Sequence, residues 1–520
     1  MTPRRASAGL AAAALAVASA ALRIPFVQRT SVYPYDSYYY LGTARSLVDD
    51  ARYWFRGAPH TRFLPLFLAL SALGSPFVGV ERAGRFIPVA AWSGVIVVTF
   101  LIGRRLVSPW AGLVAGALLV VEPIGVKWSS VPMSEAVFTL ALSGSVLAAL
   151  ASAQDKSPRW LAVAGLLGGL SLLARYEGAA ALPIMAGLGV VAGRKWGWGR
   201  VFRPLCVGLA LFIGLPALWA LRSLFVNAPD QSYAQELSAH LLTDAAVVGR
   251  RLRYFGWEGW QDQWLALLAW LGVAACAVRA GRRLAAIVLG AWLALFIAGH
   301  LAWYYVYERF LVPALPAAAL LAGALVVTLG EGLVSLLGRA GARRSLAGAL
   351  AVVLGAAATG GVAYREERRA RSLTDRHILE LEDDWGGTVA RAAASDLAGV
   401  VGADEAVATD SGALVAYYSQ ARTFYLPFVE GQTVDRADFD STGPRLLTEL
   451  RAHRVRYLVL AEPPGARSPE AALGRLGLSA TGVRLLRRYA SPALGPERRP
   501  VAVGLFEVST GGLGAEAAER

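Results

Sequence analysis

Long apolar segments alternate with short, basic polar loops along the first two thirds of the chain. A helix needs about 20 mainly apolar residues to cross a membrane, and segments of this kind recur from Ala6 to Tyr364. The pattern predicts about 11 spans in an α-helical polytopic membrane protein. Their expected positions are 6–27, 85–103, 110–124, 134–151, 160–174, 179–192, 201–221, 263–278, 284–303, 310–329 and 345–363.

From Arg365 onward the apolar runs shorten to the length of strands and charged residues become frequent. This change predicts two domains, a membrane domain over 1–364 and a soluble α/β domain over 365–520. In the second domain we expect helices at 413–419 and 470–477. The expected strands cover 406–411, 422–427, 456–462 and 501–508.

Composition agrees with a membrane protein and excludes several other classes. Hydrophobic residues make up 56%, charged residues only 17%, and the mean hydropathy is +0.47, which is not typical of a soluble chain of 520 residues. The net charge of +14 comes mostly from basic residues at span ends, where they orient the chain rather than bind nucleic acid. Cys206 and Cys276 both lie in apolar segments, so neither a disulfide nor a zinc framework is expected.

The basic clusters predict the topology, because cytoplasmic loops carry the excess of Lys and Arg. If Phe63 to Val80 crossed the membrane, the later clusters would lie outside, so we expect this segment to lie along the outer interface or to re-enter. The N-terminus is then cytoplasmic and the tail domain extracytoplasmic. The first apolar segment could be a secretory signal that ends near Ala20, but its continuation to Val27 favours a retained span.

With this topology, unusual polar residues gather at the outer face. Ionisable groups at membrane depth are costly and usually face a cavity, so such a cluster is a candidate site. The loop from Arg222 to Asp262, rich in Tyr and Trp, could cover that cavity, bind an acceptor or connect two spans at the interface. The clustered polar residues are Asp36, His60, Arg62, Glu122, Lys127, Ser129, Ser130, Glu135, Arg175, Glu177, Glu308 and Arg309.

Asp36 stands out as a lone acid inside the aromatic stretch SVYPYDSYYY of the first outer loop. We expect a short surface helix from Asp36 to Val48, and the carboxylate suggests a catalytic base that faces a water-filled cavity. The alternative is that Asp36 only caps this helix. Glu135 also has two interpretations, a functional role or a structural one, since an acid in a first helical turn suits the helix dipole.

In the order of these motifs, the chain resembles the polyprenyl-phosphate-dependent membrane glycosyltransferases of type C, especially the lipid A aminoarabinose transferases and the protein O-mannosyltransferases. Asp36-x-x-x-Tyr40-x-x-x-x-Arg45 is similar to the first acidic motif of that family. The other matching stretches are HTRFLPLFLAL, Glu81 to Pro123 with its basic turn, SVPMSEAVFTLAL with Glu135, GLLGGLSLLARYEGAAALP and YERFLVPALPAA. The chain departs from many members in having Ser37 where a second acid follows the first, and Arg62 in place of a Lys-Pro pair.

The resemblance implies that a sugar passes from a polyprenyl phosphate to an acceptor hydroxyl with inversion at the anomeric carbon. Asp36 would be the base, and Glu135 takes the family's second acidic position. The cations that would hold the phosphate are Arg175 and Arg309, with Arg62 and Lys127 in reserve. The residues expected at the acceptor or the cavity wall are Tyr40, His60, Glu177 and Glu308. Each arginine has a simpler alternative as an interfacial anchor.

No cofactor and no metal are expected, because the five histidines show no ligand spacing. The expected partners are the lipid-linked sugar donor, a lipid, glycan or protein acceptor, and the membrane. The expected location is the bacterial plasma membrane. The rival function is a transporter or lipid flippase, for which paired repeats or broken helices at the midplane would be typical. A noncatalytic scaffold would require Asp36 to be dispensable.

Overall fold

The computed structural model describes a large part of the chain, and its residues form two compact units. The first unit comprises Met1–Arg29 and Leu64–Thr374, and the second comprises Thr30–Phe63 and Asp375–Arg520. The described residues are 3–55, 57–226, 245–260, 263–301, 306–339, 364–377, 387–426, 438–439, 442–462, 468, 470–478, 482–490 and 502–509.

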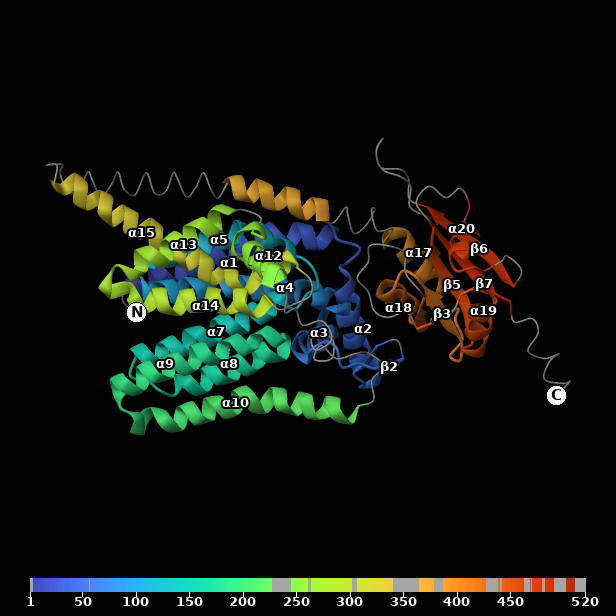
Figure 1. Ribbon diagram of the computed structural model, residues 1–520, viewed down its shortest axis with the longest axis horizontal. Helices are drawn as coiled ribbons and strands as arrows, with labels where there is room; N and C mark the ends of the chain where they lie inside the picture. The colour runs from blue at the N-terminus through green and yellow to red at the C-terminus, as the bar shows by residue number, and fades with distance from the viewer. Residues whose placement is uncertain are drawn as a thin grey trace. The chain divides into compact units, whose positions relative to one another are not determined.

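The first unit is helical, and Figure 1 shows α7, α8, α9 and α10 running side by side within it. Short 3-10 segments (η1, η3, η4) and a π-helical turn (η2) interrupt the α-helices. The elements are α1 (Pro3–Arg29), α3 (Pro65–Val78), α4 (Val80–Leu106), α5 (Pro109–Val121), α6 (Pro123–Ser129), α7 (Glu135–Gln154), α8 (Trp160–Ala174), η1 (Tyr176–Ala180), α9 (Ala181–Trp196), α10 (Trp198–Phe225), α12 (Ala245–Arg253), η2 (Tyr254–Glu258), α13 (Gln263–Ala277), η3 (Ala280–Arg282), α14 (Arg283–Leu301), η4 (Glu308–Ala314) and α15 (Leu315–Arg339).

The predicted class is confirmed: the chain is a multi-pass helical membrane protein with a C-terminal α/β region. Within the described residues, seven helical segments are long and apolar enough to cross a membrane, or eight if α5 and α6 form one broken span. Three further apolar helices, α3, α8 and α13, are shorter. The total of about 11 spans stays a prediction, and the span expected at 345–363 lies outside the described residues.

Helix α3 covers most of the segment from Phe63 to Val80, which the basic clusters predict not to cross the membrane. It has 14 residues, or about 21 Å at 1.5 Å per residue, whereas the hydrocarbon core is about 30 Å thick. This length supports the non-crossing interpretation, which stays a prediction.

The expected span at 110–124 corresponds to α5, and α6 follows it after a bend of 59° at Pro123. Pro123 has no N–H to offer the carbonyl of Leu119, four residues earlier. The guanidinium of Arg23 supplies donors instead, to the carbonyls of Leu119 and Val120 at 3.4 and 3.0 Å. It also donates to the hydroxyl of Ser129 at 2.6 Å. Arg23, fully buried in α1, therefore fixes the break and with it the start of α6.

The second unit contains a five-stranded sheet in the order β4-β3-β5-β7-β6. Strand β3 pairs parallel with β4 and β5, whereas β7 pairs antiparallel with β5 and β6. The elements are α2 (Tyr35–Asp50), β1 (Trp54–Phe55), β2 (Ala58–Pro59), α17 (Gly387–Leu397), β3 (Ala406–Thr409), α18 (Ala413–Ser419), β4 (Arg422–Tyr425), α19 (Gly443–Ala452), β5 (Val455–Ala461), α20 (Glu470–Arg475), β6 (Val483–Ala490) and β7 (Ala502–Val508).

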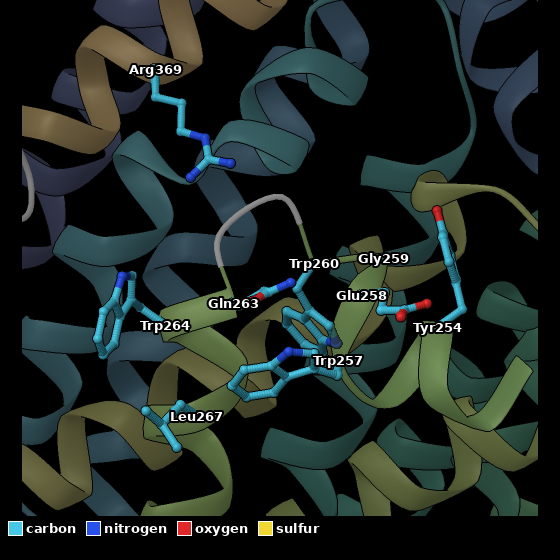
Figure 2. A pocket seen from close by; sticks show the side chains of 9 residues that line it. All are labelled: Tyr254, Trp257, Glu258, Gly259, Trp260, Gln263, Trp264, Leu267 and Arg369. Atoms are coloured by element: carbon cyan, nitrogen blue, oxygen red, sulfur yellow. The ribbon is translucent and has the colours of Figure 1, made fainter. Parts of the chain in front are cut away.

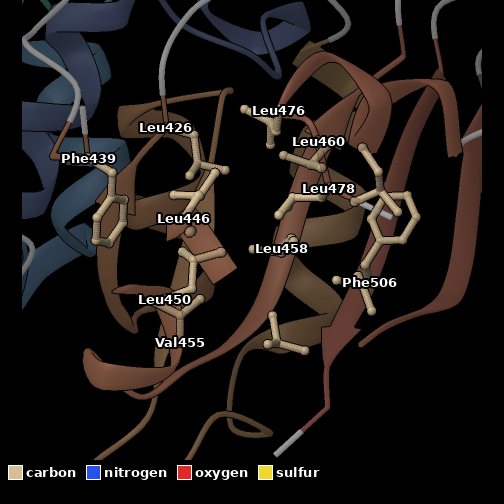
Figure 3. Packing of buried hydrophobic residues seen from close by; sticks show 14 of the residues in the cluster. Leu426, Phe439, Leu446, Leu450, Val455, Leu458, Leu460, Leu476, Leu478 and Phe506 are labelled. Atoms are coloured by element: carbon tan, nitrogen blue, oxygen red, sulfur yellow. The ribbon is translucent and has the colours of Figure 1, made fainter. Parts of the chain in front are cut away.

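A hydrophobic core lies between one face of this sheet and the helices α19 and α20 (Figure 3). Leu458 and Leu460 of β5 point to this side, because alternate residues of a strand share a face. Leu446 and Leu450 of α19 and Phe506 of β7 complete its centre. Helix α17 packs against β5, β6 and β7. Central strand β5 is therefore an almost continuous apolar run, which is why its sequence was recognisable.

The four expected strands correspond to β3, β4, β5 and β7, and the two expected helices correspond to α18 and α20. Strand β6 was not expected, because six of its eight residues are exposed and its sequence VRLLRRYA has no alternating apolar face. Three arginines on this edge strand discourage pairing with another chain. The first-loop segment Thr30–Phe63 belongs to the same compact unit as the tail, which the division into 1–364 and 365–520 does not describe.

Candidate functional site

Six of the ten predicted site residues come together in the first unit. Five of them lie on α6, α7, η1 or η4, and Arg175 lies between α8 and η1, so separate parts of the sequence contribute to one place. Their side chains are mostly buried, with exposed fractions from 1% to 25%. We call this set the ion-pair cluster, and it consists of Lys127, Glu135, Arg175, Glu177, Glu308 and Arg309.

Arg175 is held by two carboxylates. One terminal nitrogen of its guanidinium donates to Glu135 Oε1 at 2.9 Å, and the other donates to Glu177 Oε1 at 2.8 Å. Glu135 begins α7 and is 1% exposed, so both the helix dipole and the arginine stabilise its charge. Glu135 therefore fills the structural role considered from the sequence and is also part of the cluster.

Arg309 approaches the same carboxylate. Its Nε lies 3.9 Å from Glu135 Oε1, which makes Glu135 the point where two arginines converge. The guanidinium of Arg309 also lies over the rings of Trp128, Tyr307 and Phe310, at 5.9, 5.4 and 5.6 Å from their centroids. Aromatic faces attract a cation and exclude water from it, so they strengthen its interaction with an anion.

Lys127 forms the remaining contact of the cluster. Its Nζ lies 2.7 Å from Glu308 Oε1, and both side chains are largely buried. Lys127 reaches this position from α6, the short helix that follows the break at Pro123. The Arg23 hydrogen bonds at that break therefore also position Lys127.

His300 belongs to this region although its role was not predicted. Its Nε2 lies 3.6 Å from Glu177 Oε1, its Nδ1 lies 2.7 Å from the carbonyl oxygen of Phe296, and its ring stacks on Phe310 at 4.8 Å. A buried histidine at the predicted outer end of a span was the available signal. Arg23, a lone arginine inside the first apolar segment, was a second signal of the same kind.

The other four predicted residues, Asp36, Tyr40, His60 and Arg62, lie in the second unit. Asp36 is half-buried in the first turn of α2, and the expected helix over 36–48 is confirmed as Tyr35–Asp50. Pro34, not Asp36, occupies the N-cap position. The capping explanation for Asp36 is therefore weakened, although an acid in the first turn still suits the dipole.

Three of these four side chains pack around Phe63. Tyr40, one turn after Asp36, lies 4.8 Å from the Phe63 ring, and Arg62 lies 5.9 Å from it. His60 is fully buried, stacks on Phe63 at 5.5 Å and accepts a hydrogen bond from the Phe63 N–H at its Nε2. His60 thus has an evident packing role, and its predicted place at an acceptor site stays a prediction.

Helix α2 packs against the carboxyl ends of the parallel strands β3 and β4. The hydroxyls of Tyr39 and Tyr425 lie 3.1 Å apart, and Tyr35 fills the space beside Gly412. Arg45 lies over the Tyr417 ring at 4.2 Å and donates to the carbonyl of that residue. In an open α/β sheet, ligands usually bind at the carboxyl ends of the parallel strands. Here α2 occupies that position.

Asp410 and Ser411, at the end of β3, were considered as markers of a binding crevice or as loop caps. The carboxylate of Asp410 accepts hydrogen bonds from the Ala461 N–H at 2.9 and 3.1 Å and pairs with Arg475 at 3.2 Å. These contacts support the capping interpretation. Burial raises the pKa of Asp410, which its hydrogen bonds oppose.

The comparisons with known proteins agree with this architecture. Residues 60–219 match the model of the dolichyl-phosphate-mannose-protein mannosyltransferase family. The structure of ArnT from Cupriavidus metallidurans bound to undecaprenyl phosphate superposes with a TM-score of 0.59 at 15% identity, covering 95% of this chain and 97% of that one. This chain has the type C glycosyltransferase fold. No curated protein sequence matches it.

Two further structures share the type C fold. The oligosaccharyltransferase AglB from Archaeoglobus fulgidus, in complex with an inhibitory peptide and a dolichol-phosphate, gives a TM-score of 0.58 at 13% identity, covering 88% of this chain and 70% of that one. The arabinofuranosyltransferase AftD from Mycobacteria gives a TM-score of 0.50 at 15% identity, covering 97% of this chain and 42% of that one. The resemblance inferred from the motifs is therefore confirmed.

Proposed function

We propose that this protein is an integral membrane glycosyltransferase that moves a sugar from a polyprenyl phosphate to an acceptor outside the cytoplasm. Asp36 takes the proton of the acceptor hydroxyl, whose oxygen attacks the anomeric carbon of the donor. The bond between that carbon and the phosphate oxygen breaks, and polyprenyl phosphate leaves with the electron pair. Attack opposite the leaving group inverts the anomeric centre.

The observation that carries this proposal is the convergence of Arg175 and Arg309 on Glu135, with Lys127 nearby, in a chain of the type C fold. A phosphate leaving group needs cationic donors that are already in place when its charge develops. Arg suits this role through its planar fork, and the aromatic faces around Arg309 add to the local field. Arg62 remains a reserve ligand.

The charge balance of the cluster explains why so many acids accompany the cations. Three cations and three carboxylates cancel, so the cluster is neutral when His300 is neutral. A lipid phosphate brings additional negative charge, and the cations must then share their donors between carboxylates and phosphate. We propose that the carboxylates of Glu135, Glu177 and Glu308 hold the cations extended until the phosphate arrives.

The lipid part of the donor is supported by the relatives, whose structures contain undecaprenyl phosphate and dolichol-phosphate. We place the protein in the bacterial plasma membrane, with a cytoplasmic N-terminus and an extracytoplasmic tail domain, on the basis of the basic clusters. In this arrangement Asp36, which lies outside the apolar helices, works in the extracytoplasmic half of the molecule. No metal enters the proposed reaction.

Transfer of radiolabelled sugar from polyprenyl-phosphate donors in proteoliposomes tests the proposal. Asp36→Asn should lower the rate by about 100-fold or more, the usual contribution of a general base. Asp50→Asn is the matched control, because Asp50 is an exposed acid at the end of the same helix. Equal rates for Asp36→Asn and wild type would remove Asp36 from the mechanism.

The same proteoliposomes distinguish a glycosyltransferase from the rival function. A transporter or lipid flippase would move a lipid-linked sugar across the proteoliposome membrane without breaking its anomeric bond. If the wild-type protein transfers no sugar from any donor but translocates a labelled lipid, the glycosyltransferase proposal fails.

A further inference from the structure

A cavity of about 520 Å³ lies in the first unit between the π-helical turn η2, the start of α13 and Arg369 (Figure 2). Its volume falls within the range of small-molecule sites, about 300–1,000 Å³. Four aromatic side chains line it. They are Tyr254, Trp257, Trp260 and Trp264.

The wall of this cavity is fixed by hydrogen bonds of the π-helical turn. Trp260 is 4% exposed, and its indole N–H donates to the carbonyl of Phe255 at 2.8 Å. The N–H of Gly259 donates to the carbonyl of Tyr254 at 2.7 Å. By contrast, Trp257 and Trp264 are 37% and 57% exposed and present accessible ring surface. Single π-helical turns of this kind are frequent at functional sites.

Polar groups lie among these rings. Glu258, Gln263 and Arg369 contribute carboxylate, amide and guanidinium groups to the lining, whereas Leu267 alone is aliphatic among the described lining residues. A pocket for a lipid chain would instead be lined mainly by aliphatic side chains and have few polar groups. A sugar ring presents polarised C–H groups on its face and hydroxyls at its rim, which match the electron-rich face of an aromatic ring and the donors and acceptors beside it.

Phe255 lies between the wall of the cavity and the residues that border the ion-pair cluster. The Phe255 ring is 1% exposed and lies 5.3 Å from the ring of His300 and 6.5 Å from that of Phe310. Burial raises the pKa of Tyr254 to about 12, and the carboxylate of Glu308 in the cluster acts in the same direction. A chain of contacts from Tyr254 through Phe255 and His300 to Glu177 therefore links the wall of the cavity to the cluster.

We propose that this cavity binds a saccharide unit of the acceptor, an assignment that rests on the glycosyltransferase function proposed above. The donor sugar is bonded directly to the phosphate, so it must lie next to the cations that hold the phosphate. Lys127, Arg175 and Arg309 do not line the cavity. The cavity therefore suits the other reactant, and the acceptor is a glycan or glycolipid.

Saturation-transfer NMR on the full chain in lipid nanodiscs tests this assignment without turnover. The probes are the methyl glycosides of mannose, glucose, galactose and arabinose. At least one should bind to the wild type, and Trp257→Ala should weaken its binding by up to about tenfold, the usual worth of one aromatic contact. Trp257→Phe, which keeps a ring, should recover part of the loss. Trp110→Ala is the matched control, because Trp110 is an exposed tryptophan at the start of α5, outside the cavity.

A transfer assay supplies the second readout, in which Trp257→Ala should raise the KM for the acceptor by a similar factor and leave the KM for the donor unchanged. Binding of no glycoside, or equal binding to wild type and Trp257→Ala, overturns the assignment. Displacement of the glycoside by a sugar-linked undecaprenyl phosphate but not by undecaprenyl phosphate alone assigns the cavity to the donor sugar and also overturns it. If glycosides bind but the wild type transfers no sugar, the saccharide pocket stands and the proposed enzyme function falls.

Discussion

The hydroxyl of Tyr39 in α2 lies 3.1 Å from the hydroxyl of Tyr425 at the end of β4, although 386 residues separate them in the sequence. The Tyr35 hydroxyl lies 3.1 Å from that of Tyr39, so three phenols form one connected row. Asp36 stands between Tyr35 and Ser37 on the same helix. The tail domain therefore fixes the helix that carries the proposed base, and we propose that it acts in the reaction by holding this helix in place.

Gly412→Ala should weaken this seating and lower transfer. A Cβ at Gly412 would lie 2.6 Å from the Tyr35 ring, closer than atoms can approach, so this ring, one of the contacts that seat α2, must move. Because the proposed proton transfer to Asp36 depends on the placement of this residue, we expect the rate to fall by about 10- to 100-fold, as for other small misplacements. The measurement is the rate of sugar transfer in proteoliposomes at saturating donor.

The control for Gly412→Ala is Gly399→Ala. Both glycines have positive φ, +59° and +79°, so each substitution costs about 1–3 kcal/mol in backbone strain, but a Cβ at Gly399 meets no atom within 4 Å. Equal losses of activity in the two variants would mean that backbone strain, and not the position of α2, causes the effect.

A second prediction concerns Arg175 and Glu135, which should behave as a coupled pair. Arg175→Gln leaves the buried Glu135 carboxylate with only the more distant Arg309, so the free energy of unfolding should fall by about 3 kcal/mol. The double variant Glu135→Gln/Arg175→Gln should cost less than the sum of the single ones, with a coupling of about 1–3 kcal/mol. Chemical unfolding in mixed detergent micelles measures all four members of this cycle.

Arg105 and Asp155 provide the comparison for that cycle. They lie 2.8 Å apart, like Arg175 and Glu135, but their side chains are 32% and 44% exposed. Solvent screens such a pair, so its coupling should stay below about 1 kcal/mol. Similar couplings for the two pairs would show that burial does not strengthen the contact between Arg175 and Glu135.

The sequence allowed much of this arrangement to be predicted, for identifiable reasons. Helical spacing after Asp36 predicted α2, and continuous apolar runs predicted β3 and β5. The basic loops placed Lys127, Glu135, Arg175 and Arg309 at one face, and the structure brings these four residues into the ion-pair cluster. For these elements and residues, local periodicity and charge asymmetry were sufficient for the prediction.

Other features depend on contacts that no local pattern contains. The seating of α2 pairs Tyr39 with Tyr425, and periodicity cannot identify partners that are hundreds of residues apart. The break at Pro123 is visible in the sequence, but its donor, Arg23, comes from another helix. Strand β6 has an exposed, basic sequence, so only its pairing with β7 makes it a strand.

A third prediction concerns the pH dependence of the tail domain. The guanidiniums of Arg484 and Arg456 lower the pKa of Glu507 below its ordinary value of 4.5. Because the folded pKa is the lower one, these pairs stabilise the fold fully above pH 4.5, and this contribution is lost as the pH falls through the folded pKa. Its size should be at most about 1 kcal/mol, since both arginines are partly exposed.

Thermal unfolding of the full chain between about pH 3 and pH 7 measures this effect. Glu507→Gln should lower the stability near neutral pH and flatten its decline in acid. Glu449→Gln is the control, because Glu449 pairs at 3.5 Å with Arg445, which is 84% exposed. An unchanged acid profile in Glu507→Gln would assign the pH dependence to other groups.

The last prediction concerns Arg23, which positions α6 and thereby Lys127. Arg23→Leu removes the Arg23 donor of the Val120 carbonyl at the break between α5 and α6, whereas the Leu119 carbonyl keeps the indole N–H of Trp92. An unsatisfied buried carbonyl costs about 1–3 kcal/mol. We therefore expect a lower unfolding temperature and faster hydrogen exchange of the α6 amides. Arg29→Leu, at the exposed end of the same helix, should change neither. Transfer should fall mainly through a higher KM for the donor, because a displaced Lys127 weakens phosphate binding. If the α6 amides of Arg23→Leu exchange at the wild-type rate, Arg23 does not maintain the break. Pro123 and Glu122, whose carboxylate caps α6, then maintain it.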